Sequence, residues 1–149
     1  MAESDSQLPR ALIDAYEGTS YRANAGAKWV ELRIGIPSRD LLNLYDRQGP
    51  NANIARSAAF ITAWNPFSEE LTISENAAAN AAMEANLQAC GLLYFHGEGQ
   101  GTDQQWAAEA SFLVLGITRQ AAIDLGRRYD QNAIVHAGDD AVPRLLLLR

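Results

Sequence analysis

The feature that most constrains this chain is an almost unbroken apolar run at residues 58–64, which stops in a polar turn. Only Thr62 interrupts the run, and its other members are small, β-branched or aromatic. A run of this length is too short for a typical helix and predicts a strand that is covered on both faces. Pro66 has no amide hydrogen and keeps Asn65 out of helical angles, so the strand is expected to end there.

Strand and helix patterns alternate along the rest of the chain. Helices are predicted at residues 8–16, from residue 38 onward, at 72–90 and at 118–129. Strands are predicted at 19–23, 28–34, 58–64, 92–96, 112–117 and 133–136, with 144–148 as a last strand or short helix. This order indicates an α/β or α+β sandwich, with one mixed sheet of about five to seven strands and about four helices. We expect residues 1–6 to be disordered and residues 7–149 to form a single globular domain.

Composition excludes several classes of partner. The chain has 149 residues, 48% of them hydrophobic, and a formal net charge of −6. An acidic chain without clustered cations is not expected to bind nucleic acid or an anionic membrane directly. The segment at residues 1–6 is acidic and has no apolar core, and no long apolar run occurs elsewhere. We therefore expect neither a signal peptide nor a membrane span, and a cytoplasmic location.

The longest predicted helix carries polar side chains on its apolar stripe. At 100° per residue, Asn76 and Asn80 share one side of this helix with Met83 and Leu87. A buried amide without a hydrogen-bond partner costs roughly 1–3 kcal/mol. The two asparagines are therefore expected either to tie the helix to the turn at Asn65 or to bind a ligand, and both alternatives stay open.

The end of the central strand is the predicted mouth of a binding site, because ligands of open α/β sheets bind outside the carboxyl ends of strands. The predicted ligand-binding residues are Arg33, Thr62, Asn65, Ser68, Asn76 and Asn80. Arg33 would pair with an anionic group of the ligand, and the alternative is an exposed ion pair with Glu31. Glu109 is the weak candidate for a catalytic acid or base. Whether the chain is an enzyme is left undecided.

The remaining candidate motifs predict no further chemistry. The glycines at residues 97–101 have neither P-loop nor dinucleotide spacing, and we expect a mobile loop or a lid at 97–105. His96 and His136 show no metal-ligand spacing, so no metal and no cofactor are expected. Cys90 lies on the apolar stripe of the long helix and is expected to be a small core residue.

Several stretches together match a known pattern. They are Leu32-Arg33-Ile34-Gly35, residues 59–66, Glu75-Asn76 with Asn80, Gly97-x-Gly99, Trp106, Glu109, Gly116-Ile117, Leu125-Gly126 and Gln131-Asn132-Ala133. The chain resembles the bacterial domain-of-unknown-function family 3293 over about residues 20–145. The resemblance implies a small, single-domain, cytoplasmic bacterial protein, and it brings no activity, substrate or catalytic residue with it.

Two functional hypotheses follow from these observations. The first is a site for a polar small molecule at the strand ends, with an anionic or nucleotide-like ligand as one possibility. The second is a protein–protein interaction module without a small-molecule pocket, which would use an exposed sheet edge. Neither hypothesis involves direct nucleic-acid binding or a membrane.

Overall fold

The computed structural model describes residues 7–26, 28–48, 54–101 and 108–149. The strands are β1 (Ser20–Ala25), β2 (Lys28–Leu32), β3 (Ala58–Ile61), β4 (Leu93–Gln100), β5 (Glu109–Leu115), β6 (Ala133–Ala137) and β7 (Arg144–Leu147). The helices are α1 (Arg10–Glu17), α2 (Arg39–Gln48), α3 (Ile73–Ala89) and α4 (Arg119–Arg128), with a short 3-10 turn, η3 (Pro66–Ser68), after β3. These elements confirm the predicted α+β class. The segment at 1–6, which we expect to be disordered, lies outside the described residues.

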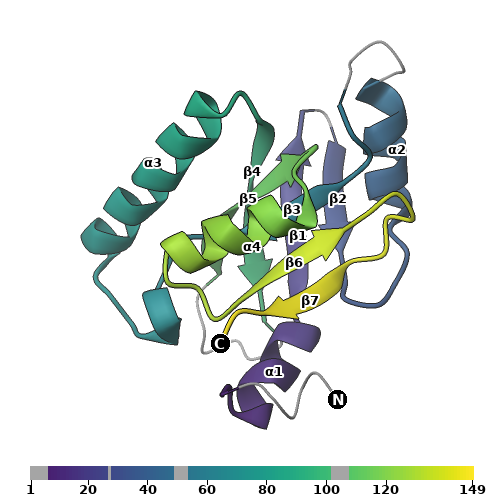
Figure 1. Ribbon diagram of the computed structural model, residues 1–149. Coiled ribbons are helices and arrows are strands. Elements are labelled where there is room, and N and C mark those ends of the chain that lie inside the picture. Colours follow the sequence, from purple (N-terminus) through teal and green to yellow (C-terminus); the bar gives the residue numbers. More distant parts are fainter. Residues whose placement is uncertain (1–6, 27, 49–53, 102–107) are drawn as a thin grey trace.

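The seven strands form one sheet in the order β2-β1-β4-β5-β3-β6-β7 (Figure 1). Every described pairing is antiparallel, so the expected mixed sheet is wrong. The reason lies in strand order: β3 and β4 run the same way, but β5 lies between them and pairs with both. The core segment β3-α3-β4-β5-α4-β6 therefore has the β-α-β-β-α-β arrangement of ferredoxin-like folds.

Both faces of the central strand are buried, as the apolar run predicts. All four residues of β3 are buried, and successive side chains point to opposite faces of the sheet. Ala59 and Ile61 pack with α3 and α4 on one face. Ala58 and Phe60 pack with α2 on the other face, so the sheet lies between helices (Figure 1).

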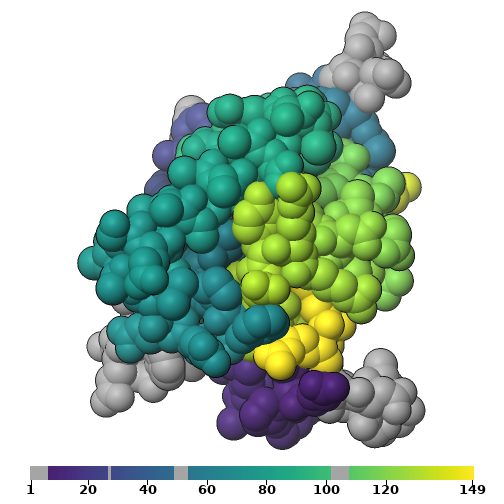
Figure 2. Space-filling view, turned by 60° about the vertical axis from the view of Figure 1, so that its left-hand side comes forward, coloured from purple at the N-terminus to yellow at the C-terminus, as the bar shows by residue number. Residues whose placement is uncertain are grey.

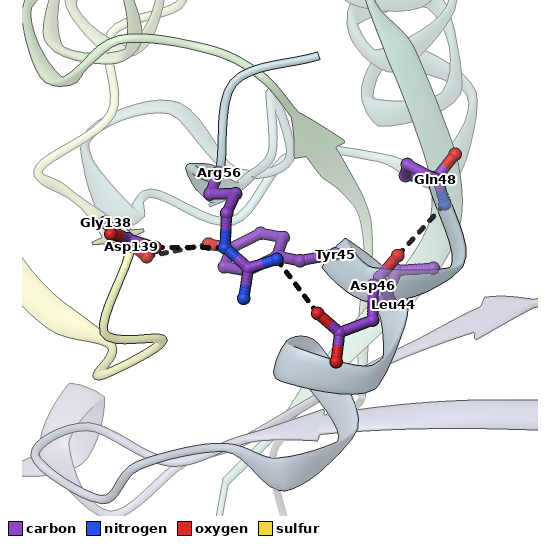
Figure 3. Close-up of polar contacts among 7 residues, drawn as sticks. All are labelled: Leu44, Tyr45, Asp46, Gln48, Arg56, Gly138 and Asp139. Carbon is purple, nitrogen blue, oxygen red and sulfur yellow. Dashed lines mark hydrogen bonds and ion pairs between the residues drawn. The ribbon is translucent and has the colours of Figure 1, made fainter. Parts of the chain in front are cut away.

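The sheet curls, so that the connection after β2 meets the turn between β6 and β7. The Gly35 amide donates to the Pro143 carbonyl at 2.8 Å. Close by, Arg56 donates to Asp46 of α2 and to Asp139 of the β6–β7 turn, both at 3.0 Å (Figure 3). The same guanidinium lies over the Tyr45 ring. These contacts hold α2 and the β6–β7 turn to the segment that enters β3.

The long helix begins and ends as its sequence predicts. Thr72 and Glu75 form a complete capping box at its start. Gly91 follows its end with a φ of +68°, a conformation that suits glycine. Cys90 is exposed, so its predicted place in the core is wrong. The residue caps the helix end, where the apolar stripe no longer faces the sheet.

The predicted glycine loop is wrong for the part that the structure describes. Residues 97–100 continue β4: residues 97–99 pair with both β1 and β5, and Gln100 pairs with β1. A Cβ on Gly97 would collide with the backbone oxygen of Arg22, so glycine allows β1 to approach closely. Residues 102–105 of the expected lid lie outside the described residues, as does Trp106.

Candidate functional site

The turn after β3 is held in place by its own polar side chains. Thr62 Oγ1 donates to the Ala110 carbonyl at 2.7 Å and accepts from the Trp64 amide at 3.0 Å. Three residues of the turn, Asn65, Phe67 and Ser68, have positive φ. This conformation is strained for residues other than glycine and persists where surrounding contacts enforce it.

The two buried asparagines of α3 supply those contacts. Asn80 Oδ1 accepts from the Ala63 amide, and Asn80 Nδ2 donates to the Ala110 carbonyl, both at 2.9 Å. Asn76 Oδ1 accepts from the Asn65 amide, and Asn76 Nδ2 donates to Asn65 Oδ1, both at 2.7 Å. The amides therefore tie the helix to the turn, the first of the two alternatives drawn from the sequence.

This network fixes the orientation of the Asn65 side chain. Its Oδ1 accepts from the Leu71 amide and from Asn76, which leaves Nδ2 as the outward donor. Asn65 Nδ2 donates to Glu109 Oε1 at 3.4 Å. The geometry thus aims one amide donor at one carboxylate, where the start of β5 lies beside the turn that follows β3.

Glu109 is the first residue of β5 and the chemically distinctive group of this region. Burial raises the pKa of its carboxyl group, and the hydrogen bond from Asn65 opposes that rise only in part. Within the described ranges, Asn65 is the only donor to this carboxylate. A carboxylate can accept about four hydrogen bonds, so most of its capacity is left for another partner.

Ser68 belongs to a second group of hydrogen-bonded polar side chains, next to the turn after β3. Asn132 Nδ2 donates to Ser68 Oγ at 2.8 Å, and the Tyr16 hydroxyl lies 3.2 Å from the same oxygen. Burial raises the pKa of the Tyr16 and Tyr21 hydroxyl groups, and the charge of Glu109 adds to both rises. We call the set Thr62, Asn65, Ser68, Asn76, Asn80, Glu109 and Tyr16 the strand-end cluster.

Tyr16 is the member of this cluster that sequence reasoning did not single out as a site residue. It lies on α1, at the end of the sheet where η3 and the C-terminus also lie (Figure 1). The Tyr21 hydroxyl donates to the Tyr16 carbonyl at 2.8 Å, which docks α1 on β1. No local pattern in the sequence signals this contact, because it depends on where α1 packs.

Arg33 is placed apart from the strand-end cluster. Its Nε lies 3.3 Å from Glu31 Oε1, and no hydrogen bond or ion pair among the described residues links it to the cluster. It lines a shallow surface pocket of about 160 Å³ beside the start of α2. The exposed ion pair, the alternative considered from sequence, is the contact that forms.

The histidines are also held by protein groups. His96 Nε2 lies 3.1 Å from Glu84 Oε2 on the α3 side of the sheet. His136 Nε2 lies 3.1 Å from the Ile117 carbonyl oxygen. Among the described residues, no three His, Cys, Asp or Glu side chains are grouped closely enough to hold a metal ion.

Comparison with known proteins identifies one family. Residues 61–134 match the family described as "Protein of unknown function (DUF3293)", which confirms the resemblance over this part of the chain. The matched segment runs from the last residue of β3 into β6, and it includes all of the strand-end cluster except Tyr16. Neither a curated protein nor a solved structure matches the chain.

The length and composition of the helices decide whether any of them could cross a membrane. Within the described ranges, none of the helices combines the length and the apolar character needed to cross a bilayer.

Proposed function

We propose that the strand-end cluster is a binding site for a small polar molecule. The observation that carries the proposal is the Glu109 carboxylate, which is largely buried yet, among the described residues, receives one long hydrogen bond, from Asn65 at 3.4 Å. A buried carboxylate normally has several donors, because the loss of hydration must be offset. A ligand with hydrogen-bond donors would provide the missing ones.

The other members of the cluster then have distinct roles. Asn76, Asn80 and Thr62 are committed to the turn, so they are positioning residues. Asn65 and Glu109 would contact the ligand. The segment after β3 reaches the surface between α3, the C-terminal strand and α1, where a ligand could approach it (Figure 2).

An anionic or nucleotide-like ligand has less support than it had from sequence alone. That hypothesis depended on Arg33 lying at the site, and Arg33 is instead paired with Glu31. A ligand that offers donors to Glu109 fits the described groups better. The proposal keeps the expectation of a bacterial cytoplasmic protein, which rests on the family resemblance.

The alternative function is a protein-binding module that uses the β2 edge of the sheet. Trp29 of this edge strand is 55% exposed, which favours a contact surface. The Glu31 amide of the same strand, however, donates to Asp40 Oδ2 at 3.1 Å. Part of the edge is therefore blocked against pairing with another strand, and the small-molecule site is the better supported function.

Asn65→Asp tests the proposed site. Aspartate keeps the oxygen that accepts from Leu71 and Asn76, but it places a second carboxylate oxygen against Glu109. NMR titration of the ¹⁵N-labelled protein with a fragment set of amides, amines and carboxylates should shift signals of Asn65 and Glu109. The shifts should be lost in Asn65→Asp.

Asn86→Asp is the matched control, because Asn86 lies on α3 and bonds the Tyr129 hydroxyl outside the cluster. This control should bind as the unmodified protein does. A fragment set that leaves the strand-end signals unmoved, or moves them equally in Asn65→Asp, would overturn the proposed function.

A further inference from the structure

The charged groups near Glu109 indicate which class of ligand the strand-end cluster would bind. Among the described residues, burial raises the pKa of Glu109 and the hydrogen bond from Asn65 lowers it. No positively charged side chain in the described ranges contributes to this pKa. The arginine nearest to η3 in the described contacts is Arg149, which lies 4.3 Å over the Phe67 ring and donates to Asn132 Oδ1. The carboxylate thus has no described cation to balance it.

The hydroxyl groups of Tyr16 and Tyr21 do not supply the donors that Glu109 lacks. Burial raises the pKa of both hydroxyl groups, and the charge of Glu109 adds to the rise. Their hydroxyl groups are engaged elsewhere, with Ser68 at 3.2 Å and with the Tyr16 carbonyl at 2.8 Å respectively. The acceptor positions of Glu109 that Asn65 leaves open are therefore available to a ligand, and a positively charged donor makes the stronger hydrogen bond to a carboxylate.

We propose that the strand-end cluster binds a ligand with a primary ammonium group, whose positive charge pairs with the Glu109 carboxylate. This inference rests on the proposed function and names its ligand class. The ammonium hydrogens fill the acceptor sites that Asn65 leaves open on Glu109. An ammonium ion also offsets the cost of holding this carboxylate charged in a largely buried place.

Three probes of nearly equal size separate the possible ligand classes: n-butylammonium, n-butanol and n-butyrate. Each is titrated into the full ¹⁵N-labelled chain while the signals of Asn65, Glu109 and Ser111 are followed. Butylammonium should move these signals, and butanol and butyrate should bind at least about tenfold more weakly, since a charge-assisted hydrogen bond contributes roughly 1.5–3 kcal/mol.

Glu109→Gln is the deciding variant, with Glu70→Gln as its control. Glutamine keeps the shape of the side chain and removes its charge, whereas Glu70 is exposed and beyond η3, so its replacement changes the net charge equally. Butylammonium affinity should fall about tenfold in Glu109→Gln and stay unchanged in Glu70→Gln. The folded state of both variants is checked in the same spectra.

The outcomes distinguish this inference from the proposed function. If butanol or butyrate binds the cluster as well as butylammonium does, or if Glu109→Gln retains its affinity, the cation class is wrong and the binding site stands. If neither these probes nor the broader fragment set moves the cluster signals, both proposals fail.

Discussion

Asn65 shows how one side chain can link the fold to a site. Its oxygen accepts two hydrogen bonds that hold the turn, and its nitrogen donates to Glu109. The sequence predicts a strand that ends at Asn65, whereas β3 ends at Ile61. It predicts the burial of Asn76 and Asn80 correctly, because helical periodicity is a local signal. It does not predict the contact with Glu109, which lies 44 residues further along the chain.

The replacement Glu109→Gln should change stability in a pH-dependent way. Because burial raises the folded-state pKa of Glu109, the folded protein binds this proton more tightly than the unfolded chain does. Glu109 therefore favours folding below its ordinary pKa, and this contribution is lost as the pH rises through the folded-state pKa. Urea denaturation should show Glu109→Gln to be more stable than the unmodified protein at neutral pH.

The gain should shrink toward zero below the ordinary glutamate pKa of 4.5, where Glu109 is protonated in both states. A variant that is less stable at neutral pH, or equally stabilised at all pH values, would contradict the burial assigned to this carboxyl group.

The replacement Asn76→Ala should destabilise the fold by about 1–3 kcal/mol, because it leaves the Asn65 amide without its acceptor. Asn86→Ala is the comparison, since it makes the same change in helix propensity at a half-buried site with one side-chain bond. Chemical denaturation should give the smaller loss for Asn86→Ala. Equal losses would mean that the Asn76 bonds to the turn add little.

At the scale of elements, local sequence patterns predict most helices and strands well. Capping residues Thr72 and Thr118 open their helices as expected, and β2 buries Val30 and Leu32 as its alternation predicts. The main error is the loop predicted at the glycines of β4. A glycine-rich stretch has the composition of a loop even where glycine is needed so that a neighbouring strand can approach closely. That need is set by the pairing of β1 with β4, which no local signal encodes.

The glycines of β4 give a prediction with a built-in control. Gly97→Ala should destabilise the protein by about 1–3 kcal/mol, since the new Cβ would press on the Arg22 carbonyl oxygen and force β1 away. In Gly99→Ala the nearest atom to the new Cβ is 3.6 Å away, so stability should change little. Thermal denaturation of the two variants tests this, and equal melting temperatures would contradict the close approach of β1.

At the scale of the whole molecule, the arrangement of strands decides where the site lies. Sequence reasoning predicts an interior strand at residues 58–64, helices on the sheet and a polar strand end. The structure has all three, with the strand shortened to Ala58–Ile61. The antiparallel pairing throughout could not be predicted, because strand order depends on contacts distant in sequence. That order is what places Glu109 of β5 beside the end of β3.

Amide hydrogen exchange should follow the same order of strands. Amides of β3 and β5 are expected to exchange only through global unfolding, because these strands are paired on both sides and buried. Amides of the edge strands β2 and β7 should exchange through local opening and become labelled first. Exchange from β3 as fast as from β2 would contradict the interior position of β3.

The most direct test of the account is the titration of the Glu109 carboxyl carbon, followed by ¹³C NMR with and without n-butylammonium. The account predicts a midpoint above the ordinary glutamate value of 4.5 in the free protein, and a lower midpoint when the cation is bound. A midpoint at or below 4.5 in the free protein, unmoved by the cation, would contradict the claim that Glu109 is a largely buried carboxylate that accepts a ligand.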